Sequence, residues 1–166
     1  MVQTGAFHGR SSYTDALQQT LLDACQGGSR ELVCIDANFA DWPWSDAAVL
    51  DALTPWAKLP GRRLKLLALQ FEDMRRLHPR FVRWRMLFDH CIEARAYEME
   101  AGSRLGFAAA LLVAGAEQPV SIRLFDTQNW RGTVSDMPAE AVRLREISDA
   151  LTQRSEPSFS STTFGL

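Results

Sequence analysis

Hydrophobic positions along this chain switch repeatedly between helical and strand-like spacing. In residues 11–26 apolar side chains recur at intervals of four, which is typical of a helix with one buried face. Residues 31–37 form a short, almost continuous apolar run with β-branched members, which predicts a buried strand. Residues 45–58 return to a helical stripe. The first third of the chain therefore predicts a helix, a strand and a second helix.

The ends of these two helices have recognisable signals. Ser12 or Thr14 is the expected N-cap of the first helix and Ser45 that of the second, because a hydroxyl oxygen can accept a hydrogen bond from an exposed helical N–H group. Pro55 lies inside the second helical stripe and predicts a kink or an early end, since proline lacks the backbone donor.

The remainder of the chain continues the alternation. An apolar strand ends near Leu69, and a short helix to about Leu77 precedes a second one that begins at Pro79. The further expected elements are strands at 92–98, 107–114 and 120–126 and a final helix at 138–154. This order predicts an α/β fold, a mixed β-sheet flanked by helices on both faces. We expect a single domain, residues 1–155, followed by a polar C-terminal tail, residues 156–166.

Composition supports an ordered globular domain. Hydrophobic residues make up 46% of the 166 residues and charged residues 23%, and the net charge is −2, which gives no general attraction to nucleic acid or anionic membranes. Three cysteines without C-x-x-C spacing predict neither a disulfide framework nor a zinc site, and no cofactor is indicated. The sequence has no run of eighteen apolar residues and no apolar leader. We expect a cytoplasmic protein that does not associate with membranes.

The charge is unevenly distributed, and the basic residues concentrate in residues 61–95, which carry nine basic and four acidic residues. On a helix over 79–90, four apolar side chains fall on one face, with Arg80 and Arg83 beside it and Arg85 pointing away. These four are Phe81, Trp84, Leu87 and Phe88. We interpret the segment as a buried aromatic face bordered by solvated or ion-paired arginines.

Two other interpretations of the basic segment stay open. One is weak nucleic-acid or anion binding through residues 62–85, although the scattered arrangement of the arginines disfavours nucleic acid as a partner. The candidate anion-binding residues are Arg75, Arg76, Arg80 and Arg83. The other is a protein interface, where arginine and aromatic residues are both enriched.

Polar residues that follow the strands are the best candidates for a site. Asp36, Asn38 and Asp41 lie at the end of the strand predicted at residues 31–37 or just after it. Ligands of open α/β sheets bind beyond the carboxyl ends of strands. Glu72 and Asp73 follow the next strand, so a metal-assisted hydrolase that uses Asp36, Asp41, Glu72 and Asp73 is one alternative. The competing interpretation is helix capping, because acidic residues are expected where helices begin.

Two further groups are candidates for contact with a small-molecule ligand whose identity the sequence does not reveal. Trp42 and Trp44 flank Pro43 and could edge a pocket or pack over a helix start. His8 and Arg10 precede the first helix, where an anion could meet exposed N–H groups. The chain has no G-x-S-x-G turn and no glycine-rich phosphate-binding loop.

The order of these segments resembles the phospholipase D-like fold over most of residues 7–155. The resemblance is carried by "LLDACQGG", "LVCIDA", "SDAAVLDALTPWAK", "RLKLLAL" and "RFVRWRMLFDHCIEARAY" in this succession. More narrowly, the chain resembles uncharacterised bacterial single-domain proteins that end in a helix and a tail like "RSEP…TTFGL".

The resemblance implies a phosphodiesterase chemistry whose residues are missing from this sequence. That chemistry needs two copies of an H-x-K motif, in which histidine attacks phosphorus and lysine stabilises the phosphate charge. The corresponding strand reads "FAAALLVAG" here, with Phe107 and Ala109 at the motif positions, and neither Lys58 nor Lys65 follows a histidine by two. We therefore assign no catalytic residue and expect a degenerate, non-catalytic domain that acts as a binding or assembly module. Because active members of the family pair two motifs, a homodimer is a further expectation.

Overall fold

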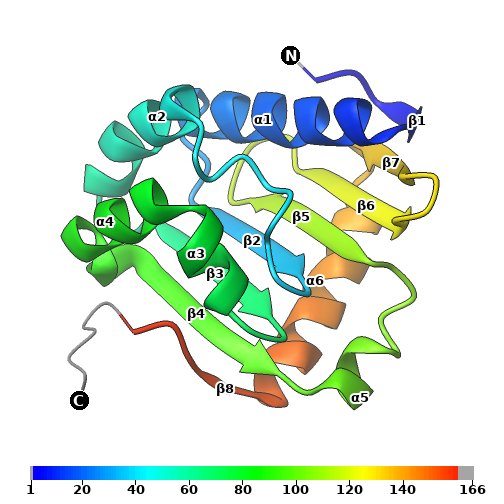
Figure 1. Ribbon diagram of the computed structural model, residues 1–166. Helices are drawn as coiled ribbons and strands as arrows, with labels where there is room; N and C mark the ends of the chain where they lie inside the picture. Colours follow the sequence, from blue (N-terminus) through cyan, green and yellow to red (C-terminus); the bar gives the residue numbers. More distant parts are fainter. Residues whose placement is uncertain (1, 161–166) are drawn as a thin grey trace.

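Eight strands form one mixed sheet in residues 2–160, the part of the chain that this computed structural model describes (Figure 1). Three adjacent strands are parallel to one another, and the remaining pairs are antiparallel. The spatial order is β1-β7-β6-β5-β2-β3-β4-β8. The strands are β1 (Gly5–His8), β2 (Glu31–Asp36), β3 (Arg63–Ala68), β4 (Ile92–Tyr97), β5 (Ala109–Ala114), β6 (Val120–Asp126), β7 (Arg131–Ser135) and β8 (Ser155–Pro157).

The helices lie in two layers. One layer contains α1 (Arg10–Gln26), α2 (Ala47–Lys58), α3 (Glu72–Leu77) and α4 (Pro79–Leu87). The opposite face is covered by α6 (Pro138–Gln153), which passes behind the sheet in Figure 1. A short helix, α5 (Met99–Gly102), follows β4, and a 3₁₀ turn spans Asp89–Cys91. This arrangement confirms the predicted α/β class with helices on both faces.

Alternate residues of the central strands supply two separate cores. In β2, Leu32 and Cys34 face the layer of α1 to α4, whereas Val33 and Ile35 face α6. All four of these side chains are buried. Burial on both sides explains why the predicted strand reads as a continuous apolar run instead of an alternating one.

Strand direction brings several chain segments to one end of the sheet. The parallel strands β2, β3 and β4 all end there, and because β5 is antiparallel to β2, it begins there. By the same alternation β6 ends and β7 begins at this end, and β1 leads into α1 beside them. Residues far apart in the sequence consequently meet at the carboxyl end of the parallel strands.

Most predicted elements are confirmed, but the predicted caps are wrong. Gly9 occupies the N-cap position of α1 with no side-chain hydrogen bond, so neither Ser12 nor Thr14 caps it. The cap of α2 is Asp46, whose carboxylate accepts a hydrogen bond from the Ala48 N–H. The helix α2 also continues through Pro55 to Lys58, so the predicted early end is wrong. Strands β1, β7 and β8 and the helix α5 were not predicted.

The basic segment forms α3 and α4 as predicted, and the aromatic residues Phe81, Trp84 and Phe88 are buried. Two details of the prediction are wrong. Leu87, assigned to the buried face, is 76% exposed, and Arg85, assigned to solvent, is buried. Arg85 lies against the ring of Phe159, with the guanidinium carbon 4.5 Å from the ring centroid. Burial of Arg85 therefore depends on a residue seventy-four positions downstream.

The first residues of the predicted tail lie on the domain. Ser155–Pro157 pairs with β4 as the antiparallel strand β8. Phe159 is buried and stacks on Phe71 with ring centroids 5.0 Å apart. The guanidinium carbon of Arg75 also lies 5.0 Å from the centroid of the Phe159 ring. Residues 161–166 of this predicted tail lie outside the described residues.

Candidate ligand pocket

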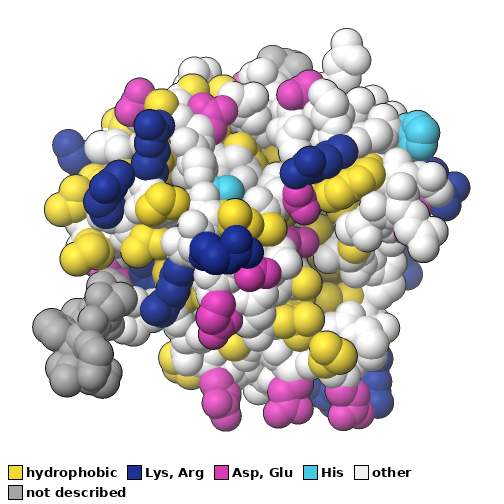
Figure 2. All heavy atoms as spheres, in the orientation of Figure 1, with side chains coloured by type: hydrophobic (Ala, Val, Ile, Leu, Met, Phe, Trp, Pro, Cys, Tyr) yellow, Lys and Arg dark blue, Asp and Glu magenta, His cyan; other side chains and the backbone are white. Residues whose placement is uncertain are grey.

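A cavity of about 520 Å³ opens at the carboxyl end of the parallel strands. We call it the edge pocket. In Figure 2, apolar and acidic side chains meet on the viewed face between α3 and the turn that joins β6 to β7. The residues that line the edge pocket are Tyr13, Asp36, Ala37, Asn38, Asp41, Trp42, Leu69, Tyr97, Met99, Gly102, Ser103, Leu105, Phe107, Ala108, Leu124, Thr127 and Trp130. Its size falls in the range typical of small-molecule sites.

Asp36 is the last residue of β2 and is half-buried in the pocket wall. One carboxylate oxygen, Oδ2, accepts hydrogen bonds from the N–H groups of Phe39 (2.6 Å) and Asn38 (3.3 Å). These bonds hold a tight turn in which Phe39 has a left-handed backbone, with φ of 59°. Burial raises the pKa of Asp36 to about 6 despite these bonds, and the neighbouring Asp41 raises it further.

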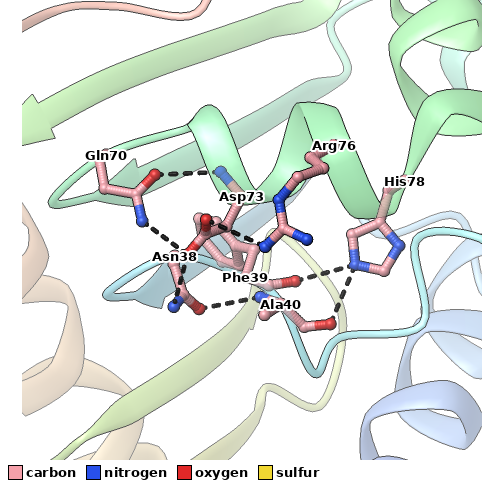
Figure 3. Close-up of polar contacts among 7 residues, drawn as sticks. All are labelled: Asn38, Phe39, Ala40, Gln70, Asp73, Arg76 and His78. Atoms are coloured by element: carbon pink, nitrogen blue, oxygen red, sulfur yellow. Dashed lines mark hydrogen bonds and ion pairs between the residues drawn. The ribbon is translucent and has the colours of Figure 1, made fainter.

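The loop after β2 is braced against α3. Asn38 Nδ2 donates to Asp73 Oδ2 at 3.3 Å, and Gln70 Nε2 donates to the same oxygen at 2.9 Å (Figure 3). Arg76 approaches the other oxygen of Asp73 at 3.5 Å. Asn38 Oδ1 in turn accepts a hydrogen bond from the N–H of Ala40. The polar residues after β2 and β3 therefore do come together, but most of their hydrogen bonds are to one another.

His78 anchors the same loop from beneath. Its ring is buried, and Nε2 lies 3.1 Å from both the Phe39 and Ala40 carbonyl oxygens, to which an Nε2–H donates (Figure 3). With that tautomer Nδ1 can accept a hydrogen bond from the Ser45 hydroxyl, 2.6 Å away. Both ring nitrogens are thus engaged in holding the loop.

Aromatic side chains from separate elements form much of the remaining wall. Tyr13 comes from α1, Tyr97 from the end of β4, and Trp130 from the turn before β7. Tyr13 and Trp130 pack with ring centroids 5.8 Å apart. Trp130 adopts a left-handed φ of 53°, a conformation uncommon for an aromatic residue.

Trp42 and Trp44 behave differently from each other. Their rings stack with centroids 5.8 Å apart and planes 11° apart, but only Trp42 lines the edge pocket. Trp44 is fully buried and packs on Phe81, so it belongs to the core. The two interpretations of this pair, pocket edge and packing over a helix start, each describe one of the two residues.

Two polar groups, the Tyr13 hydroxyl and the Trp42 indole N–H, are buried inside the pocket wall. Burial raises the pKa of Tyr13, and the adjacent Trp42 indole opposes this rise. Neither group has a hydrogen bond of strict geometry within the described residues, and both side chains are only 2% exposed. The two groups therefore lie against each other within the wall and do not face the cavity.

Arg10 lies at the rim of the pocket. Its guanidinium forms an ion pair with Asp41 at 2.6 Å and lies 5.8 Å from the centroid of the Trp130 ring. Because Asp41 is already paired, Asp36 is the pocket carboxylate without a cationic partner among the described residues. His8 is exposed at the end of β1 and does not line the pocket.

The helix α5 closes the side of the pocket next to β4. Gly102 lies so close to Tyr97 that a Cβ atom at this position would stand 2.7 Å from the ring carbon Cε1. Glycine is required here for the close approach of the two segments. Sequence reasoning missed Tyr13, Tyr97 and Trp130 as pocket residues, because a single aromatic residue in a helix, strand or turn carries no local signal of its partners.

Phe107 and Ala109, the positions that the resemblance assigns to the H-x-K motif, lie at this end of the sheet. Ala109 pairs with Asp36 across β5 and β2, and Phe107, two residues earlier, lines the pocket. Both side chains are buried. A phenyl ring and a methyl group supply neither a nucleophile nor a positive charge.

The predicted metal ligands do not form a metal site. Within residues 2–160 no group of three or more histidine, cysteine, aspartate or glutamate side chains lies close enough to hold a metal ion. Glu72 is exposed, and Asp73 is engaged by Asn38, Gln70 and Arg76. The geometry therefore gives no support to a metal-assisted hydrolase at these carboxylates.

The candidate anion-binding arginines are distributed around α3 and α4. Figure 2 shows Lys and Arg side chains on the side of the molecule where α2, α3 and α4 lie. Arg75, Arg76, Arg80 and Arg83 are all exposed. Arg75 contacts Phe159 and Arg76 pairs with Asp73, whereas Arg80 and Arg83 have no ion pair within the described residues.

Comparison with known proteins identifies the fold. No family model and no curated protein matches the sequence. Among solved structures, Nuc from Salmonella typhimurium, a phospholipase D family member, matches with a TM-score of 0.56 and 13% identity over 95% of this chain and 100% of Nuc. TrmBL2, an archaeal chromatin protein with a novel mode of DNA binding, matches with a TM-score of 0.59 and 13% identity over 94% of this chain. This chain spans about half of TrmBL2, 54% of its length.

The chain thus has a phospholipase D-like fold. At 13% identity the likeness extends to the architecture alone. In the described part of the chain, none of the helices is both long enough and apolar enough to cross a membrane.

Proposed function

We propose that this chain is a non-catalytic phospholipase D-like domain that binds a small molecule in the edge pocket. The observation that carries the proposal is the contrast between two features at the same end of the sheet. The positions that the resemblance assigns to the catalytic histidine and lysine are the buried residues Phe107 and Ala109, and a cavity of about 520 Å³ is lined by Phe107.

The surroundings of the pocket support binding over phosphodiesterase chemistry. Its lining contains no histidine, lysine or arginine. Lys65 is buried within β3, and His78 uses both ring nitrogens to hold the loop after β2. A phosphate ester in this pocket would meet Asp36 and aromatic rings but no imidazole nucleophile and no cationic side chain of the lining to neutralise its charge.

A pocket-filling variant tests the proposal. Ser103→Trp places a large ring at an exposed position in the pocket wall, whereas Gln153→Trp adds the same ring at an exposed position of α6 outside it. We expect compounds of a metabolite library to raise the melting temperature of the wild type and of Gln153→Trp but not of Ser103→Trp. Hits that persist in Ser103→Trp, or a library without any hit on the wild type, would contradict ligand binding in this pocket.

Hydrolysis provides the complementary test. We expect no turnover of bis-p-nitrophenyl phosphate by the purified protein, with or without Mg²⁺ or Mn²⁺. Turnover that disappears when His8, His78 or His90 is replaced by alanine would overturn the non-catalytic part of the proposal.

A second candidate function is assembly into a homodimer through the surface of α3 and α4. Leu77, Met86 and Leu87 are 42%, 60% and 76% exposed, and Arg80 and Arg83 lie on the same helices. Exposed apolar residues interspersed with arginine are typical of protein interfaces. Sedimentation velocity at micromolar concentration tests this function: we expect a dimer that Leu87→Glu dissociates, and a monomeric wild type would exclude it.

A further inference from the structure

The charge of the edge pocket restricts what it can bind. Its lining includes two carboxylates, Asp36 and Asp41, and no cationic side chain. Arg10 pairs with Asp41 at the rim, which leaves the Asp36 carboxylate without a counter-ion among the described residues. An anionic ligand would be repelled by Asp36, whereas a cationic ligand would supply the missing counter-ion.

The aromatic wall favours the same class of ligand. Tyr13, Trp42, Tyr97, Phe107 and Trp130 line the pocket from five different parts of the chain. The face of an aromatic ring carries partial negative charge and attracts cations, most strongly when water is excluded. A pocket that combines several such rings with one unpaired carboxylate matches an organic cation, which has both apolar surface and positive charge.

From this combination we propose that the edge pocket binds a small organic cation, an amine or quaternary ammonium compound. Its positive group lies against Asp36 between the aromatic rings. This inference rests on the proposed function of the pocket as a ligand site and adds the chemical class of the ligand.

Proton binding at Asp36 should then control affinity. The titratable groups that face Asp36 are Asp41 of the same loop, Tyr13 of α1 and Tyr97 of β4, and Cys34 of β2 lies near Tyr13. Burial raises the pKa of both tyrosines and of Cys34, so these three stay neutral between about pH 5 and pH 8, and Asp41 is paired with Arg10. Because the pKa of Asp36 is about 6, only about a tenth of this carboxyl group is charged at pH 5. With a neutral form that binds about tenfold more weakly, a permanent cation should bind about fivefold more tightly at pH 8 than at pH 5.

A pair of matched probes isolates the charge of the ligand. Choline and 3,3-dimethylbutan-1-ol have the same shape and hydroxyl group, but only choline is charged. In isothermal titration at pH 8 we expect choline, or the larger benzyltrimethylammonium, to bind at least tenfold more tightly than the neutral alcohol. If neither cation binds more tightly than 3,3-dimethylbutan-1-ol, the inference is overturned.

Matched variants locate the charge in the protein. Asp36→Asn keeps the single oxygen that accepts both backbone hydrogen bonds but removes the charge, so it should weaken cation binding about tenfold and abolish its pH dependence. Asp51→Asn removes a charge from an exposed position of α2 outside the pocket and should leave both unchanged. Equal cation affinity in Asp36→Asn and the wild type would overturn the inference.

The outcome also separates this inference from the proposed function. If a neutral polyol or an anion is the ligand that Ser103→Trp excludes, the pocket is a ligand site but its assigned chemistry is wrong. If the library yields no hit that Ser103→Trp abolishes, the proposed function itself fails, and the cation inference fails with it.

Discussion

At the scale of single residues, Asp36 is the pocket carboxyl group whose pKa the fold raises. Its pKa is raised from 3.8 to about 6 by burial, so the folded state holds the proton more tightly than the unfolded state does. This contribution to stability is fully present below about pH 4 and is lost as the pH rises through about 6. A charged Asp36 therefore destabilises the fold at neutral pH.

The variant Asp36→Asn should consequently be more stable than the wild type at pH 7.5, by about 2 kcal/mol, and nearly equal to it at about pH 4. Urea unfolding at both pH values measures the difference. The amide oxygen of asparagine can keep both turn hydrogen bonds, so a variant less stable than the wild type at pH 7.5 would show that the charge itself stabilises the turn.

At the scale of elements, the loop after β2 is held by its contact with the junction of α3 and α4. His78 at that junction binds two carbonyl oxygens of the loop and the Ser45 hydroxyl. We expect His78→Ala to lower the free energy of unfolding by about 2 to 3 kcal/mol and to weaken ligand binding, because the carbonyl oxygens of Phe39 and Ala40 lose their donor. His90→Ala, at an exposed position, is the control and should change stability by less than about 0.5 kcal/mol.

The segment after α6 stabilises α3 and α4 through one aromatic residue. Phe159 stacks on Phe71 and lies against Arg85, so its removal opens a cavity and exposes an arginine that is otherwise buried. Phe159→Ala should lower the free energy of unfolding by about 3 kcal/mol, measured by chemical unfolding. Phe125→Ala at a 48% exposed position should cost much less, and equal losses in the two variants would show that the segment contributes little.

At the scale of the whole molecule, the charge distribution argues against nucleic acid as a partner. The net charge is −2, and of the four exposed arginines on α3 and α4, two are engaged by Asp73 and Phe159. TrmBL2 shares the fold and binds DNA, but at 13% identity the fold does not carry that activity to this chain.

In a mobility-shift assay at about 50 mM salt we expect no retention of duplex DNA. Retention that weakens with salt and is lost in an Arg80→Ala, Arg83→Ala double variant would contradict this expectation.

The sequence by itself determined the order of most elements, the α/β class and the absence of an H-x-K motif. Hydrophobic period and proline position are local properties, so the runs in β2 and β3 and the break before Pro79 could be recognised without any knowledge of the fold. The polar residues after β2 could be identified as a candidate site for the same reason, because strand ends are visible in the sequence.

Only the tertiary structure decided what these residues meet. Strand direction brings Tyr13, Tyr97, Phe107 and Trp130 to Asp36, and the pairing of β8 with β4 leads to Phe159, which covers Arg85. The strands β1 and β8 have only four and three residues, which is too short to show a periodic pattern in the sequence. Their positions depend on pairing with strands that are distant in the sequence. The pocket could not be predicted, because its walls come from separate segments that only strand pairing brings together. The local sequence of one segment does not show which other segments it will contact.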